Sequence, residues 1–211
     1  MYLGRIVAIG MTPAGKAAAM YRVSSRSFPN REAVLIGNQV AILPRAGFEA
    51  DLRRNPYISY NCIRLAGEWA VATNGSQTDP IVEKIAMGFP PRDAISLGLL
   101  AMDYEKDSLD TPRIVAVVSS RKPVGYLGII RKDALLVREF PLVPGEVRYL
   151  STYEKNTPSL HQVTTGFDGV CAECAAAYIV NGGIFAEFTN PVTSAAAVAD
   201  GDGFGLAVKV L

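Results

Sequence analysis

The chain has few of the side chains that metal centres use. Its 211 residues include a single histidine and three cysteines, namely His161, Cys62, Cys171 and Cys174, whereas a structural zinc site takes four ligands of these types. Cys171 and Cys174 lie at i, i+3 in an alanine-rich run that predicts a helix, where cysteine behaves as a small apolar residue. We therefore expect no metal site here and a surface position for His161. A metal or redox role of the pair is the alternative.

The sequence also lacks an excess of either charge and any long apolar run. Lys and Arg total 21 against 20 for Asp and Glu, a net charge of +1, so no global field attracts nucleic acid or an anionic membrane. No apolar run approaches the roughly 20 residues that span a bilayer. The first residues, MYLGRIVAIG, are typical of a strand rather than a signal peptide. With an odd cysteine count, this predicts a cytoplasmic protein with no nucleic-acid or membrane partner.

Two motifs of enzyme families are missing as well. No G-x-S-x-G segment is present to support a Ser-His-Asp triad. The glycines of GDGFG, residues 201–205, are not followed by Lys-Ser or Lys-Thr, so a turn is the better interpretation than a phosphate loop.

What is present is a globular composition, 49% hydrophobic, arranged as strands in blocks. Strands are predicted at 2–9 and 17–25, over 34–44 around Gly37-Asn38, in a hairpin over 60–75, in four runs at 113–120, 124–130, 134–140 and 146–153, and at 204–211. Blocks of strands favour an α+β fold with mostly antiparallel sheets, two of which face each other with helices outside. No linker composition interrupts residues 1–211, so a single domain is expected.

Helices are predicted at 79–88, 91–106 and 171–183. The first begins with Asp79 as N-cap candidate and Pro80 at the first helical position. The GFPP segment separates it from the second, which has apolar residues at helical spacing. Residues 182–188 and 191–201 stay undecided between helix and strand.

The stretch YRVSSRSFPNR, residues 21–31, holds three arginines and three serines and no acidic residue. Arginine offers forked donors to phosphate oxygens, and serine adds neutral donors beside them. A phosphate cradle and a solvated turn both fit this run.

Other polar clusters have two interpretations each. Asn74 and Ser76 sit between a strand and a predicted helix start, where backbone N–H groups favour anions; an ordinary turn is the alternative. Tyr57, Tyr60 and Asn61 either contact a base or pack at a sheet edge.

A cluster of charged residues follows the second predicted helix. Asp103, Tyr104, Glu105 and Lys106 combine two carboxylates, a phenol and an amine, the groups of a general acid and base. Charged residues are also common where a helix leaves the core. Carboxylates near a helix C-terminus are unfavourable against the helix dipole, which favours a functional role.

Eight segments together resemble the archaeal-type IMP cyclohydrolase family, and the similarity extends from the first residues to nearly the last. It is weaker over 11–20, 119–148 and 160–180. The segments are YLGRIVAIG, YRVSSRSFPNR, RNPYISYNCIR, TNGSQTD, LLAMDYEKD, DTPRIVAV, YLSTYE and FTNPVTSAAA.

The resemblance implies an enzyme of purine biosynthesis. Members close 5-formamidoimidazole-4-carboxamide ribonucleotide to inosine 5′-monophosphate with loss of water, and they use a four-layer αββα fold similar to that of N-terminal-nucleophile hydrolases. A Tyr2 that follows Met1 offers no such nucleophile, so a shared scaffold with different chemistry is expected. The resemblance also implies a homotetramer, a small-molecule purine ribonucleotide as ligand, and no cofactor.

Site roles follow as a hypothesis. We expect the 5′-phosphate on Arg22 and Arg26 with Ser24 or Ser25, with Arg31 as a surface residue. Tyr60 and Asn61 orient the heterocycle or donate to the formyl oxygen, and Asn74 and Ser76 add donors. Glu105, or Asp103 in its place, moves the proton, with Tyr104 as donor and Lys106 tuning them. A purine-nucleotide-binding regulator without catalysis is the alternative function, and an amidohydrolase is a third.

Overall fold

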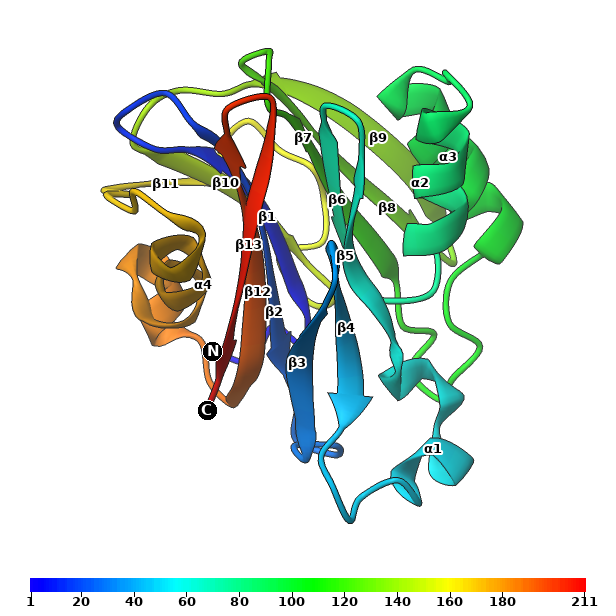
Figure 1. Ribbon diagram of the computed structural model, residues 1–211. Helices are drawn as coiled ribbons and strands as arrows, with labels where there is room; N and C mark the ends of the chain where they lie inside the picture. Colours follow the sequence, from blue (N-terminus) through cyan, green and yellow to red (C-terminus); the bar gives the residue numbers. More distant parts are fainter.

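The computed structural model describes all residues 1–211 and contains two antiparallel β-sheets (Figure 1). The six-stranded sheet has the order β11-β10-β1-β2-β12-β13 and the seven-stranded sheet the order β3-β4-β5-β6-β7-β8-β9. The strands are β1 Ile6–Met11, β2 Ala17–Ser24, β3 Arg31–Ile36, β4 Gln39–Pro44, β5 Tyr60–Ala66, β6 Trp69–Thr73, β7 Arg113–Ser119, β8 Val124–Arg131, β9 Ala134–Pro141, β10 Glu146–Ser151, β11 Val163–Thr165, β12 Pro191–Asp200 and β13 Gly203–Val210.

Helices cover the outer faces of both sheets (Figure 1). Helix α4 (Ala172–Asn181) lies on the six-stranded sheet, whereas α2 (Thr78–Ala86) and α3 (Pro91–Met102) lie on the seven-stranded sheet. The short helix α1 (Asp51–Arg54) and the 3₁₀ turns η1 (Pro56–Ile58) and η2 (Gly183–Glu187) complete the elements. No helix is both long and apolar enough to cross a membrane.

Alternation along the strands builds three apolar layers. Val7 and Tyr21 point into the core between the two sheets, whereas Ala8 and Met20 point towards α4. A third layer joins the seven-stranded sheet to α2 and α3. Because strand side chains alternate between faces, central strands covered on both sides are apolar along their whole length, and all eight residues of β2 are buried.

The predicted α+β class with mostly antiparallel sheets is confirmed, as are most elements. The β1–β2 and β5–β6 hairpins form, the 34–44 run becomes β3 and β4 joined at Gly37, where φ is +59°, and the four following runs become β7 to β10. The undecided stretch 191–201 is strand β12 in the middle of its sheet.

Three details differ from the predictions. Helix α2 has Gln77 at its N-cap rather than Asp79, whose carboxylate instead accepts from Asn61 and Arg64. Helix α3 ends at Met102 rather than near 106, because Asp103 adopts a positive φ of 55° that a right-handed helix cannot continue. The first strand begins at Ile6 rather than at residue 2.

Candidate active site

A buried ion pair lies just before β1. Arg5 Nη2 donates to Glu105 Oε2 at 2.9 Å, and the Glu105 side chain is only 1% exposed. Arg113, the first residue of β7, places Nη1 4.0 Å from the second carboxylate oxygen. Burial raises the pKa of Glu105, and the charges of Arg5 and Arg113 oppose that rise. This carboxylate is therefore less acidic than an exposed glutamate although two guanidinium groups flank it.

The end of α3 sets the direction of Glu105. The reversal at Asp103 turns the chain inward, and Glu105 N then donates to Thr111 O at 2.9 Å. Arg113 is fixed from two sides, donating through Nε to Asp103 O at 2.8 Å and through Nη1 to Gln77 Oε1 at 2.9 Å. The helix end and the start of β7 are thus tied into one unit around the carboxylate.

Two tyrosines and a third arginine adjoin the pair. The hydroxyls of Tyr21 and Tyr60 lie 2.5 Å apart between the sheets. Burial raises the pKa of both phenols, and for Tyr60 the charges of Arg31 and Arg5 oppose the rise. Arg31, the first residue of β3, is buried and donates from Nε to Phe28 O at 3.1 Å. Both phenols therefore stay protonated hydrogen-bonding groups at neutral pH.

Arg5 and Arg31 face a cavity of about 140 Å³, and its other lining residues include Tyr2, Ser25, Tyr57 and Tyr153. A wider recess of about 520 Å³ shares residues with this cavity and adds Arg26. The two hollows share Tyr2, Ser27, Leu109 and Tyr153. They form an inner, cationic chamber with an open mouth. Glu105, Tyr21 and Tyr60 do not line the chamber and lie behind its arginines.

Unpartnered polar atoms collect at this chamber. Only four buried side-chain nitrogen or oxygen atoms lack a hydrogen-bond partner, and three of them are Arg5 Nε, Arg31 Nη1 and Glu105 Oε1. Buried polar groups in folded proteins are almost always paired, because each unpaired one costs about 1–3 kcal/mol. Donors and an acceptor left open beside one cavity indicate a polar ligand that satisfies them.

A glycine keeps room for this arrangement. A Cβ on Gly75 would lie 2.5 Å from Arg113 Nη1, 2.7 Å from Gln77 Oε1 and 3.5 Å from Glu105 Oε1. Any larger residue at position 75 would displace the guanidinium that flanks the carboxylate. By contrast, no group of three or more His, Cys, Asp and Glu side chains is placed to hold a metal ion.

Arg22 and Ser24 lie elsewhere, which corrects their expected phosphate contact. Arg22 is fully buried and points to the α4 side of its sheet, where Nη1 donates to Val180 O at 2.9 Å and Phe185 O at 2.8 Å, and Nη2 donates to Phe188 O. Its Nε donates to Ser24 Oγ at 2.9 Å. The guanidinium closes the C-terminal end of α4 and η2, and it shares no cavity with Glu105.

Ser25 and Arg26 are the members of the same run that reach the hollows. Ser25 lines the inner chamber, and its hydroxyl accepts from Phe28 N at 3.0 Å. Arg26 lies at the mouth with its guanidinium 4.2 Å from the centre of the Tyr2 ring. Arg31, expected at the surface, is instead part of the buried wall.

The amide residues fall outside the chamber. Asn61 donates to Asp79 at 3.0 Å on the α2 side of its sheet. Asn74 is buried, donates to Pro112 O at 2.9 Å and accepts from Ile114 N at 2.8 Å, so it supports the start of β7. Ser76 is exposed.

Of the cluster after α3, only Glu105 is buried. Lys106 donates to Asp103 Oδ2, and its ammonium lies 3.5 Å from the centre of the Tyr104 ring. Both charged side chains of this pair are about half exposed. Asp103, Tyr104 and Lys106 therefore form a surface group rather than a set of catalytic groups around a ligand.

Sequence reasoning missed Arg5, Arg113, Tyr21 and Tyr153. Arg5 carried a signal, since it is a single charge at the edge of an apolar strand. Arg113 likewise precedes the apolar strand IVAVV. Nothing local distinguishes Tyr21 or Tyr153 from core aromatics, and their position depends on how distant strands pair.

Comparison with known proteins gives one consistent result. A model of the family described as IMP cyclohydrolase-like protein matches residues 2–203. The chain is 50% identical over 197 residues to an IMP cyclohydrolase of Methanosphaera stadtmanae, covering 93% of this chain and 94% of that one. It is 61% identical over 156 residues to that of Methanocella arvoryzae, covering 74% and 75%, and 46% identical over 208 residues to that of Methanococcus maripaludis, covering 98% and 99%. The chain therefore belongs to the IMP cyclohydrolase-like family.

Proposed function

We propose that the chamber lined by Arg5 and Arg31 is where this chain closes 5-formamidoimidazole-4-carboxamide ribonucleotide to inosine 5′-monophosphate. The observation that carries the proposal is the pair of unpartnered guanidinium nitrogens on Arg5 and Arg31, which line the chamber, with the unpartnered Oε1 of Glu105 behind Arg5. Family membership supplies the reaction, and this cluster supplies the groups that it needs.

The reaction is an intramolecular addition followed by loss of water. The carboxamide nitrogen attacks the formyl carbon, the formyl oxygen gains negative charge, and the carbinol then loses hydroxide as water while the ring nitrogen loses its proton. Since both reacting groups are on one molecule, holding them in the reactive geometry contributes up to ~7–11 kcal/mol in effective-molarity terms. The remaining needs are an oxyanion donor and a proton carrier.

Arg5 and Arg31 suit the oxyanion role. Both line the chamber, both carry an unpartnered N–H, and a fixed cation in a buried site stabilises developing negative charge more than water does. Tyr60 lies behind them as a neutral phenol whose hydroxyl is in contact with that of Tyr21. We assign the formyl oxygen to the two guanidinium groups.

Glu105 suits the role of proton carrier. Its free Oε1 accepts a proton from the carboxamide, and its raised pKa makes it a stronger base than an exposed glutamate. Arg5 is the residue that both bonds Glu105 and lines the chamber. A shift of the Arg5 side chain onto the substrate oxygen would therefore open the carboxylate to the reacting nitrogen.

The phosphate is assigned to the mouth. Arg26 is exposed there beside Ser27, and a guanidinium with a neighbouring hydroxyl matches phosphate oxygens. With the phosphate at Arg26, the heterocycle extends inward between Tyr57 and Tyr153 towards Arg5. Arg26 thus keeps the phosphate role expected for its segment, whereas Ser25 lines the inner chamber.

We further propose three properties that rest on family resemblance. The first is that the two sheets with helices outside form a four-layer αββα sandwich similar to that of N-terminal-nucleophile hydrolases, as a single domain over residues 1–211. The assembly is a homotetramer, and its place is the cytoplasm.

The direct test is ultraviolet absorbance during incubation with the formamido ribonucleotide. Ring closure changes the heterocycle and hence its spectrum, whereas binding alone does not. We expect turnover by the wild type and its loss in Arg5→Met, with Arg121→Met, at a distant surface ion pair, as the matched control. Binding of the nucleotide with an unchanged spectrum would instead identify a regulator.

A further inference from the structure

Helix α4 begins with two cysteines whose sulfur atoms are in contact. Cys171 is the N-cap residue in an extended conformation, and Cys174 is the third helical residue. Their Sγ atoms lie 2.8 Å apart, and Cys174 N donates to Cys171 Sγ at 3.3 Å. The extended N-cap therefore turns its side chain back over the first turn, where the second thiol meets it.

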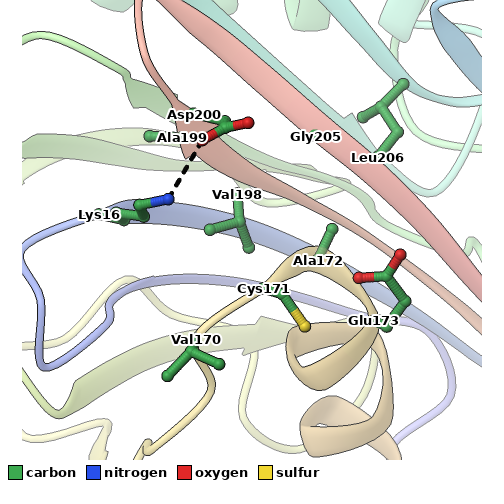
Figure 2. A pocket seen from close by; sticks show the side chains of 10 residues that line it. All are labelled: Lys16, Val170, Cys171, Ala172, Glu173, Val198, Ala199, Asp200, Gly205 and Leu206. Atoms are coloured by element: carbon green, nitrogen blue, oxygen red, sulfur yellow. Dashed lines mark hydrogen bonds and ion pairs between the residues drawn. The ribbon is translucent and has the colours of Figure 1, made fainter.

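The cysteine pair lies beside a surface hollow. Cys171 and Cys174 are half-buried, and Cys171 lines a cavity of about 190 Å³ on the outer side of the six-stranded sheet (Figure 2). Figure 2 shows Cys171 at the start of α4, with the ion pair of Lys16 and Asp200, 3.2 Å in length, across the hollow. The third cysteine, Cys62, is fully buried between the sheets.

The pKa is lowered for one of the three thiols and raised for the other two, and thiol–disulfide exchange needs one thiol that ionises readily. The hydrogen bond from the Cys171 thiol lowers the pKa of Cys174. Backbone hydrogen bonds at Val170 and Cys171 add to that effect, whereas burial and the charge of Glu173 oppose it. The hydrogen bond between the two thiols raises the pKa of Cys171, and burial raises that of Cys62. Both thiols lie at the start of α4, and helix N-termini favour the reactive thiolate. We assign the first attack to Cys174, whose pKa is the lowered one.

We propose that Cys171 and Cys174 are a thiol–disulfide exchange site that closes reversibly to an intrachain disulfide. The oxidant is a low-molecular-weight disulfide. The Cys174 thiolate attacks one sulfur of that disulfide, forms a mixed disulfide and releases one thiolate. Cys171 loses its proton to that released thiolate and attacks the Cys174 sulfur, which expels the second half as a thiolate. Solvent returns to this thiolate the proton that Cys174 had lost. Two cysteine thiols are oxidised and one external disulfide is reduced to two thiols.

The proposed site is separate from the chamber of Arg5. Helix α4 covers the outer face of the six-stranded sheet, whereas Arg5 and Arg31 lie at the starts of β1 and β3 and Glu105 lies in the loop between α3 and β7. A link between the N-cap and the third helical residue leaves the far end of α4, held by Arg22, unchanged. We expect the oxidised protein to keep its turnover.

The test equilibrates the full chain with glutathione buffers of increasing oxidised fraction, quenches with acid, and alkylates free thiols after unfolding. Intact mass then counts alkylated cysteines. The reduced protein takes three labels. The oxidised wild type is expected to lose two of the three labels and to carry no glutathione, and Cys62→Ser is expected to lose both labels that it starts with.

Single variants separate exchange from simple accessibility. Cys171→Ser retains an N-cap oxygen, so the helix start survives, and a glutathione adduct is expected to accumulate on Cys174 because the resolving thiol is gone. Cys174→Ser is expected to react more slowly than Cys171→Ser. Three labels on the wild type at every buffer ratio, or a stable glutathione adduct on the wild type, would overturn the proposal.

Discussion

Arg5, Glu105 and Arg113 place two positive charges and one negative charge in a buried site, where desolvation of each charge costs free energy. Desolvation of a buried pair often exceeds the attraction between its members, and loss of one member costs about 3–5 kcal/mol because the other is left uncompensated. The ion pair of Arg5 and Glu105 therefore contributes little net stability, and its unpartnered Nε and Oε1 atoms lower the free energy of unfolding further. Such local conflict with stability is typical of residues kept for binding or catalysis.

Glu105→Gln should lower kcat by about 10²- to 10⁴-fold, the range of general acid–base catalysis. Because burial raises the pKa of Glu105, the wild-type rate should fall on acidification at a pH above the ordinary glutamate range, as the carboxylate takes up its proton. That acid limb should disappear in the variant. The measurement is the pH profile of kcat from absorbance assays.

Asp103→Asn is the matched control, since Asp103 is a half-exposed carboxylate two residues away in an ion pair with Lys106. It should leave both kcat and the acid limb unchanged. If Glu105→Gln lowered kcat and kept the acid limb, Glu105 would only position Arg5 and would not carry the proton.

Arg31→Met should lower kcat by about 10²- to 10³-fold, the cost of removing one oxyanion donor. It should not destabilise the fold by more than about 1 kcal/mol, because the lost guanidinium makes one hydrogen bond and leaves one nitrogen unpaired. Steady-state kinetics and urea unfolding measure the two effects. Wild-type kinetics would show that the oxyanion does not lie at Arg31.

At the scale of elements, Arg22 works as a clamp. It connects β2 to the end of α4 and to η2 through carbonyl oxygens that the helix itself cannot satisfy. Burial lowers the pKa of Arg22 to about 10. No carboxylate is needed, since several carbonyl dipoles share the charge.

Arg22→Met should destabilise the protein by about 3–5 kcal/mol, because it leaves several buried carbonyl groups unpaired. The milder Arg22→Lys should be destabilised by less than Arg22→Met but still be less stable than wild type, since one ammonium reaches fewer carbonyls. KM and kcat of the folded fraction should stay near wild type. Urea unfolding and kinetics on both variants check this, and a raised KM with unchanged stability would return Arg22 to the phosphate site.

The two helices over the seven-stranded sheet meet at a glycine. A Cβ at Gly98 would overlap Ile81 Cγ1. Overpacking costs about 1–3 kcal/mol, against a gain of about 1 kcal/mol in helix propensity, so Gly98→Ala should be destabilising on balance. In an Ile81→Ala background the same change should become neutral or stabilising. Urea unfolding of the four proteins forms a double-mutant cycle, and equal effects in both backgrounds would contradict the contact.

Local sequence predicted the helices and strands well where apolar residues recur at the spacing of a strand or a helix. Hairpins with glycine turns and alternating apolar residues were predictable. The end of α3 was not, because the break depends on Asp103 adopting φ 55° with ψ −179°, a backbone conformation almost confined to glycine that no local residue pattern predicts. The strand β12 was undecided because its alanine run has weak strand propensity, and it forms where β2, β13 and α4 cover both faces.

At the scale of the whole molecule, the site exists only through long-range pairing. Arg5 and Glu105 are 100 residues apart, and the chamber adds Tyr153 from the segment after β10. The sequence therefore identified the arginine-rich run 21–31 as a possible phosphate-binding segment, but it did not show which of its arginines faces the cavity. The register of β2 decides that, because Tyr21 and Arg22 point to opposite faces of the sheet.

The buried carboxylate should also appear in global stability. Glu105 has a folded pKa above its unfolded value of about 4.3, so its contribution to the free energy of unfolding is fully present below pH ~4.3 and is lost as pH rises through the folded pKa. The stability of wild type relative to Glu105→Gln should fall as pH rises above about 4.3, until the carboxylate is ionised in the folded protein as well. Urea unfolding across that range measures it, and a difference that is flat with pH would contradict the shift.

The most direct measurement is a crystal structure of the protein soaked with inosine 5′-monophosphate. We expect the purine ring in the inner chamber, hydrogen-bonded to Arg5 or Arg31, and the phosphate at the mouth beside Arg26. A nucleotide found in any other hollow, with Arg5 and Arg31 still unpartnered, would contradict this assignment.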